Sequence, residues 1–117
     1  MAGACIFCKI IKKEIPSTVV VHENEFVLVI NDINPKAPIH YLIFPKKHIV
    51  DISHVAAEDW CCIVETLKMA SELGKKLLPP SAFNLISNNG AAAGQSVFHM
   101  HWHFLAGKNI YEGGFSL

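Results

Sequence analysis

The chain has 117 residues, of which 51% are hydrophobic, and its ten basic residues balance ten acidic ones. This length suits a single domain over residues 1–117, and the hydrophobic content excludes an intrinsically disordered chain. A chain without net charge has no overall field that would draw it to nucleic acid or to an anionic membrane, so we expect neither as a partner.

No apolar run approaches the roughly 20 residues of a membrane span. The first residues lack the basic and apolar regions of a secretory signal, so we expect an intracellular protein of the cytoplasm, with the nucleus as a further compartment. In such a compartment the four cysteines are not expected to form disulfides.

The hydrophobic pattern predicts an α+β fold, in which a five-stranded antiparallel sheet packs against one long helix and a short N-terminal helix. Proline is expected to end both the third strand, at Pro45, and the long helix, at Pro79. In chain order the pattern predicts a short helix at 5–12, strands at 18–22, 26–30 and 40–44, a helix with an apolar stripe over 60–78, and strands at 83–87 and 97–105.

The most informative motif is a row of three histidines, His99, His101 and His103, that alternate with large apolar residues. Because a strand sends successive side chains to opposite faces, the apolar residues would face a core and the histidines would share the other face. Neutral imidazole is a good nucleophile and then a good leaving group, which suits a two-step transfer of a phosphoryl group. The competing interpretation is a metal site, because His-x-His pairs are common zinc ligands.

The loop before this row has the composition of a phosphate-binding loop. Small residues such as Gly94 let the backbone approach an anion closely. The Ser96 hydroxyl and the Asn88 amide can donate hydrogen bonds to phosphoryl oxygens and so stabilise charge that grows in the transition state. By itself such a loop is only a turn, but its position beside the histidines favours a role in binding phosphate.

Residues 97–105 resemble the signature of the histidine-triad superfamily, in which three histidines alternate with hydrophobic residues. The resemblance to its Hint branch covers residues 5–105 and includes the segments 5–11, 14–16, 32–35, 37–40, 45–48 and 88–96. The branch comprises small homodimeric hydrolases that cleave AMP from an amine in purine nucleoside phosphoramidates. The resemblance therefore implies a hydrolase of the adenosine 5'-monophosphoramidase type, which binds AMP or GMP conjugates and needs no cofactor for its chemistry.

The same resemblance implies a role for each residue of the motif. His101 would attack the α-phosphorus, and His103 would contact the phosphate and help to protonate the departing amine. His99 would orient the His101 ring through its backbone carbonyl, and His40 would be a fourth, supporting histidine. Nucleotide-binding roles would fall to Asp32 at the ribose, to Phe7, Ile10, Ile30 and Ile33 around the purine, and to Asn88, Gly94, Gln95 and Ser96 at the phosphate or leaving group.

Several of these residues also have an ordinary structural interpretation. The four apolar residues could be core, Asp32 could form a turn, and His40 could be a satisfied structural histidine. Asn31, where some relatives carry histidine, leaves the purine preference open, and the tail from Lys108 leaves the leaving group open. Two alternative functions are a dinucleoside polyphosphate hydrolase, as in a sister branch, and a nucleotide-binding or scaffolding dimer with incidental activity.

Cys5 and Cys8 form a second candidate site. Relatives with this spacing resemble a zinc-binding subset whose further ligands match His48 and His99, which implies a structural zinc ion. The alternative is a pair of buried free thiols. Cys61 and Cys62 are adjacent on the predicted helix, so their side chains diverge, and we expect them in a core or an interface.

We also expect a homodimer. The apolar stripe over 60–78 is long for one small sheet to cover, and the strand at 83–87 has no charged residue to protect it as a free edge. Pairing with a second copy across a two-fold axis would remove both exposures, and the family resemblance implies the same assembly.

Overall fold

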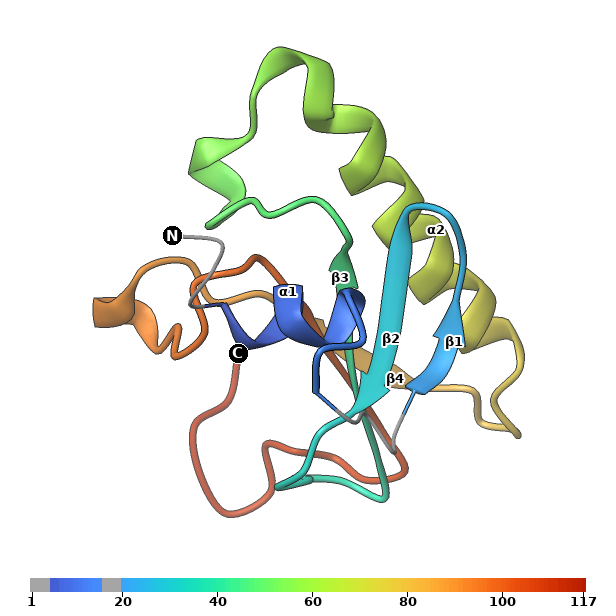
Figure 1. Cartoon of the computed structure of the whole chain (residues 1–117). Coiled ribbons are helices and arrows are strands. Elements are labelled where there is room, and N and C mark those ends of the chain that lie inside the picture. Colours follow the sequence, from blue (N-terminus) through green and yellow to red (C-terminus); the bar gives the residue numbers. More distant parts are fainter. Residues whose placement is uncertain (1–4, 16–19) are drawn as a thin grey trace.

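A five-stranded antiparallel sheet with the order β1-β2-β3-β5-β4 forms the centre of the molecule (Figure 1). The structure is a computed structural model that describes residues 5–15 and 20–117. Its helices are α1 (Ile6–Ile11) and α2 (Trp60–Lys75), and its strands are β1 (Val20–Glu23), β2 (Val27–Asn31), β3 (Ile39–Pro45), β4 (Phe83–Ile86) and β5 (Trp102–Ala106). Short 3-10 turns lie at Ile52–His54, Ala57–Asp59 and Ala91–Ala93. The predicted α+β fold is confirmed.

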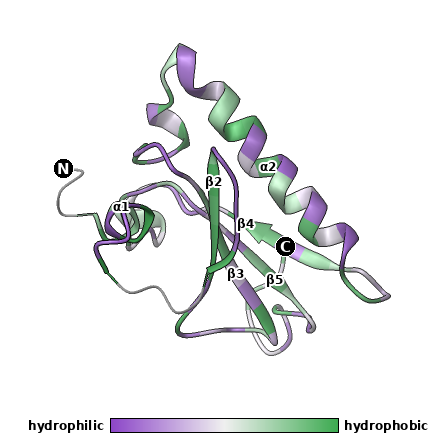
Figure 2. Ribbon diagram, turned by 45° about the vertical axis from the view of Figure 1, so that its right-hand side comes forward, coloured by the Kyte–Doolittle hydropathy of each residue, from purple (hydrophilic) through white to green (hydrophobic). Residues whose placement is uncertain are grey.

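The two helices cover opposite faces of the sheet. Alternate residues of β2 and β3 point to opposite sides, and both sides are buried, which explains why these strands read as continuous apolar runs. Figure 2 shows hydrophobic residues concentrated in the sheet, whereas α2 alternates hydrophobic and hydrophilic residues along its length. The face toward α1 packs Phe7 against Leu28, Ile30, Leu42 and Phe44, and the face toward α2 packs Met69 and Ala70 against Val27, Val29, Ile43 and Phe104.

Helix α2 is shorter than the predicted stripe, and only part of the stripe is buried. It ends at Lys75, with Lys76 as its C-cap, so Leu77 and Leu78 lie beyond the helix and Pro79 does not end it. The buried residues of α2 are Ile63, Thr66, Met69, Ala70 and Gly74, whereas Trp60, Val64 and Leu67 are exposed. Three- and four-residue steps keep the stripe on one side of the helix. The sheet contacts only one flank of that side, and Trp60, Val64 and Leu67 lie on the other flank. None of the helices in the described ranges has the length and apolarity that crossing a bilayer requires.

The fifth strand begins at Trp102, so the prediction of a strand over 97–105 is wrong for its first half. Trp102 pairs with Ile43 of β3. In the same register Met100 would lie opposite Pro45, which has no N–H to donate to a ladder. Instead, the Met100 N–H donates to the Ile49 carbonyl over 2.6 Å. The alternation nevertheless persists through this irregular segment, since Met100 packs with Ile49 and Ile63 while the neighbouring histidines turn to the α1 side.

The remaining strand boundaries differ by one or two residues. β2 runs one residue further than predicted, to Asn31, and Pro45 is the last residue of β3 rather than the residue after it. β1 extends to Glu23, while residues 18 and 19 of its predicted range lie outside the described residues. The register of β3 and β5 places His40 opposite Leu105 and Leu42 opposite His103. Both histidines therefore lie on the face that α1 covers.

Candidate functional site

His101 is held by the backbone of the residue two positions before it. Its Nδ1 lies 2.8 Å from the His99 carbonyl oxygen, and the side chain is buried. A carbonyl can only accept a hydrogen bond, so His101 Nδ1 carries the proton and Nε2 keeps a free lone pair. The Phe7 ring packs edge-on against the imidazole, with centroids 5.2 Å apart, and limits its rotation. The structure thus presents Nε2 of His101 as a nucleophile with a fixed tautomer.

The tautomer of His103 is fixed through His40. The Lys36 backbone N–H donates to His40 Nδ1 over 3.0 Å, so the proton of neutral His40 lies on Nε2. His40 Nε2 is 2.9 Å from His103 Nδ1 and 3.4 Å from an Asp32 carboxylate oxygen. It donates to His103 Nδ1, which leaves the proton of His103 on Nε2. His103 therefore offers a donor beside the acceptor that His101 offers, with ring centroids 5.2 Å apart.

Burial keeps these imidazoles neutral at pH 7. Desolvation is the largest cause that lowers the pKa of His101 and of His40 below the ordinary value. The pKa of His103 falls to about 4 because of burial and, next, the neighbouring His101 and His40 rings. A neutral His101 can attack phosphorus, and a neutral His103 can still donate its Nε2 proton.

An open cavity of about 280 Å³ lies beside His103. Asp32, which is partly buried, accepts the Asn34 N–H through Oδ1 over 2.8 Å and turns its other oxygen toward His40. A carboxylate at a polar cavity is suited to accept hydrogen bonds from sugar hydroxyls. The residues that line this cavity are Asp32, Asn34, Lys36, His40, Ile86, Asn88, His103 and Leu105.

The four residues expected around the purine fall into two groups. Phe7 and Ile30 are buried in the core under α1, where Phe7 stacks on Phe44 with centroids 4.3 Å apart. Ile10 is half-buried, and Ile33 is 85% exposed. An apolar side chain as open as Ile33, next to Asp32, is available to a flat apolar ligand. Phe7 packs edge-on against His99 and His101, whereas Ile30 belongs to the core cluster under α1.

The structure separates the residues of the expected phosphate loop. Asn88 lines the cavity of His103, and Gly94 has a φ of +100° that favours glycine. Ser96 is exposed and lines a different cavity of about 310 Å³, together with Cys5 and His48. The side chain of Gln95 is buried in the loop itself.

The ring of His99 points away from the other two histidines of the row and into a cluster with two thiols. Its Nε2 lies 2.7 Å from the Pro45 carbonyl and must carry the proton, which leaves Nδ1 free as a ligand. Nδ1 is 3.3 Å from Cys5 Sγ and 3.6 Å from Cys8 Sγ. His48 Nδ1 is 3.3 Å from Cys8 Sγ.

These four residues fit a tetrahedral zinc ion. All four ligand atoms lie within 4.8 Å of one another. Bonds of about 2.3 Å to sulfur and about 2.0 Å to nitrogen place such ligands about 3.5 Å apart, close to the observed separations. Without a metal ion, burial and then the Cys5 thiol raise the pKa of Cys8 to about 11. A cation would offset this desolvation, because thiolate is the form that binds metal.

Asp32, His40 and His103 also lie close enough together to contact one ion. A metal on His40 Nε2 would require the proton of that ring on Nδ1, which faces the Lys36 N–H. Two donors would then oppose each other, so we assign this group to hydrogen bonding rather than to metal binding.

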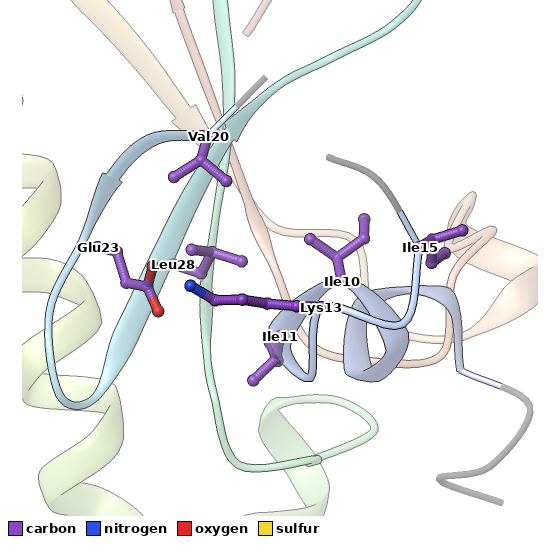
Figure 3. A pocket seen from close by; sticks show the side chains of 7 residues that line it. All are labelled: Ile10, Ile11, Lys13, Ile15, Val20, Glu23 and Leu28. Carbon is purple, nitrogen blue, oxygen red and sulfur yellow. The ribbon is translucent and has the colours of Figure 1, made fainter. Parts of the chain in front are cut away.

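A separate cavity of about 340 Å³ lies between α1 and the first two strands (Figure 3). It is largely apolar, with Lys13 and Glu23 as its charged residues, and it contains none of the histidines. Ile10 lines it, so it adjoins the side of the site expected to hold the base. Residues 15 and 20, which also line it, border the segment outside the described residues.

Sequence reasoning missed the backbone groups that set the tautomers. Lys36 and Pro45 act through an N–H and a carbonyl, so no side-chain type could mark them. The sequence pattern predicts Ile86 and Leu105 only as strand residues, yet both line the cavity. The register of β5 against β3 and β4 brings them to the site.

The depressed pKa of His103 predicts acid destabilisation between pH 6.5 and about 4. In this window the unfolded chain binds a proton that the folded chain excludes, so the free energy of unfolding falls as pH falls and is constant, for this group, above the window. One such proton gives a slope of at most about 1.4 kcal/mol per pH unit. Urea unfolding at several pH values should show a shallower slope for His103→Asn, whereas His22→Asn, at an exposed position, should keep the wild-type slope. An unchanged slope in His103→Asn would show that His103 is not held neutral by burial.

Comparison with known proteins identifies the family of this chain. The model of the HIT domain matches residues 12–110. An uncharacterized HIT-like protein of Synechocystis is 42% identical over 108 residues, which is 92% of this chain and 94% of that protein. A solved HIT family hydrolase from Clostridium thermocellum superposes with a TM-score of 0.84 at 41% identity, covering 97% of this chain and 96% of its own. A histidine triad protein from Clostridium difficile superposes with a TM-score of 0.82 at 40% identity, covering 90% and 91%. The chain therefore belongs to the HIT family, and its likeness to solved HIT family hydrolases supports a hydrolase.

Proposed function

We propose that this protein hydrolyses purine nucleoside 5'-phosphoramidates of the AMP-amine type through a nucleotidyl-histidine intermediate. The observation that carries the proposal is the pair of complementary tautomers, an acceptor Nε2 on His101 beside a donor Nε2–H on His103. The pair lies next to a cavity with a carboxylate suited to a ribose and an amide suited to a phosphate, from Asp32 and Asn88.

In the first step, His101 Nε2 forms a bond to the α-phosphorus and the bond from phosphorus to the amine breaks. The Nε2 proton of His103 moves to the departing amine. The nucleotidylated His101 ring becomes positive, since Nδ1 keeps its proton on the His99 carbonyl, and this charge offsets the negative charge left on His103. The His40 N–H also stabilises the deprotonated His103 ring through its hydrogen bond to Nδ1.

In the second step, water attacks phosphorus and its proton returns to His103 Nε2. The bond from phosphorus to His101 breaks, and AMP leaves. The Asn88 amide would donate to phosphoryl oxygens as their charge grows. Overall, one water and one phosphoramidate give AMP and an amine, and both histidines regain their initial tautomers.

His101→Ala is expected to lower turnover of an AMP-amine substrate by roughly 1,000-fold or more, because it removes the nucleophile. His54→Ala, at an exposed histidine outside the site, should retain wild-type turnover.

Intact-mass measurement of His103→Ala, quenched without acid during turnover, should show an added nucleotidyl mass. That mass should be absent from the His101→Gly/His103→Ala double variant, and its persistence there would reject His101 as the nucleophile. An inactive wild-type chain that still binds AMP would favour a binding or scaffolding dimer instead, and preference for dinucleoside polyphosphates would favour the sister activity.

A structural zinc ion at Cys5, Cys8, His48 and His99 is a second part of the proposal, supported by the spacing of the four ligand atoms. Protein purified without added metal should contain about one zinc per chain. Cys8→Ser should lose the zinc and melt at a lower temperature. Cys61→Ser, at an exposed thiol, should keep the zinc content and the melting temperature of the wild type. Wild-type protein without zinc, but with all thiols reduced, would reject the metal site. Because all four positions would be filled by protein, this ion would have no open position for substrate.

A homodimer is the third part of the proposal. Trp60, Val64 and Leu67 leave an exposed apolar surface on α2, and β4 is an edge strand with exposed Phe83 and Leu85. The groove of about 540 Å³ between α2 and β4 makes this surface continuous. The apolar area and the open edge would both be covered by a second copy across a two-fold axis.

Light scattering at low micromolar concentration should therefore report about twice the chain mass of 12.9 kDa. Leu67→Glu should give the monomer mass, because it places a charge in the apolar surface. Leu78→Glu, at an exposed leucine beyond α2, should leave the dimer intact. A monomeric wild-type chain with full activity would show that dimerisation is not needed to build the site.

A further inference from the structure

The side chain of Gln95 uses all of its amide groups inside the protein. It is 4% exposed. Its Oε1 accepts the Gly90 N–H over 2.8 Å, and its Nε2 donates to the Val50 carbonyl over 2.7 Å and to the Val97 carbonyl over 3.0 Å. A carboxamide has two N–H donors, and both are occupied. A side chain with no free donor and almost no exposure cannot bind a nucleotide directly, although the family resemblance placed it among the binding residues.

The three partners of this amide belong to three different segments. Gly90 lies in the loop that follows Asn88, Val50 lies after β3, and Val97 begins the segment that leads to His99. The Gln95 backbone N–H also donates to the Gly90 carbonyl over 3.1 Å, which closes a reciprocal pair between these two residues. One buried amide therefore joins the loop to the segment at residue 50 and to the approach to the histidines.

A second connection links the same two segments. Asn89 Oδ1 accepts the Ile52 N–H over 2.8 Å, and Asn89 Nδ2 contacts Ser87. Between the two connections the backbone adopts a φ of +96° at Gly90 and +100° at Gly94, conformations that suit glycine. The loop is thus held in one shape by side chains at both of its ends.

We propose that Gln95 is a positioning residue that holds the phosphate loop, and with it Asn88, in place for the phosphoryl group. This inference rests on the proposed function, because the loop matters to catalysis only if a phosphate lies beside His101 and His103. Gln95 acts through the loop and does not touch the substrate. Loss of its amide would release the loop from Val50 and Val97, while Asp32 and Ile33, on the base and ribose side, would keep their places.

The test compares the dissociation constants of two ligands, AMP and adenosine. The two molecules differ only by the phosphate of AMP. For Gln95→Met, which keeps the length of the side chain without its hydrogen bonds, AMP binding should weaken by about tenfold, while adenosine binding should change by less than about twofold. Gln95→Glu keeps the shape and the acceptor for Gly90 but places a carboxylate against two carbonyls, so it should show at least the same loss. Ala92→Met, at an exposed position of the same loop, should behave as wild type.

Each outcome decides the inference. Variants that bind AMP as tightly as wild type would overturn it, and so would variants that lose AMP and adenosine equally, since general damage to the fold does not distinguish the two ligands. If Gln95→Met does not fold, Gln95→Glu supplies the same comparison. The proposed function is tested separately by the wild-type chain. A wild type that hydrolyses the phosphoramidate, with variants that keep the AMP-to-adenosine ratio, would reject only the role of Gln95.

Discussion

The hydrogen bond from His101 to the carbonyl of His99 is the contact on which the site depends. A ring held at 2.8 Å from a carbonyl has its proton on Nδ1, so the lone pair on Nε2 is directed outward without a carboxylate partner. The tautomer of His103 is also set by a backbone group. The Lys36 N–H fixes the proton of His40 on Nε2, and His40 in turn fixes the proton of His103 on Nε2. Two backbone groups, one acceptor and one donor, thus make a nucleophile and an acid from chemically identical side chains.

His99 joins this chemistry to the thiol cluster. Its carbonyl holds the His101 ring, while its own ring lies among Cys5, Cys8 and His48 and donates to the Pro45 carbonyl. An ion bound by this cluster would therefore restrain the residue that orients the nucleophile, although it would not contact the substrate. The short helix α1 contributes to both parts, because it carries Cys8, has Cys5 as its N-cap, and also carries the Phe7 ring that packs against His101.

The sequence predicted those features that depend on side-chain type and spacing. The alternation of the three histidines with apolar residues predicted that they share a face, and all three do lie on the α1 side, where Phe7 contacts His99 and His101 and where His103 lies beside His101. The family resemblance placed the two cysteines with His48 and His99, and the four side chains do lie together. The sequence did not predict the features that depend on backbone geometry. The proline at 45 cannot extend the ladder, so β5 starts at Trp102, and no residue type marked the Lys36 N–H.

Burial was also beyond what periodicity could predict. Val64 and Ala70 both belong to the predicted apolar stripe over 60–78, yet Val64 is 52% exposed and Ala70 is buried, because only one flank of the helix reaches the sheet. Gln95 and Ser96 are neighbours in a motif with one expected role, but the first is buried in the loop and the second is exposed at another cavity. Their difference arises from contacts with residues about 45 positions away in the chain, such as Val50.

The protonation sites of the two histidines test the central claim most directly. Nitrogen NMR of the imidazole rings at pH 7, assigned with His101→Ala and His103→Ala, distinguishes a protonated from an unprotonated ring nitrogen. The structure predicts a proton on Nδ1 and a free Nε2 in His101, and a free Nδ1 with a proton on Nε2 in His103. A proton on Nε2 of His101, or a positively charged ring at either position, would contradict the account, because neither state presents a nucleophile beside a neutral acid.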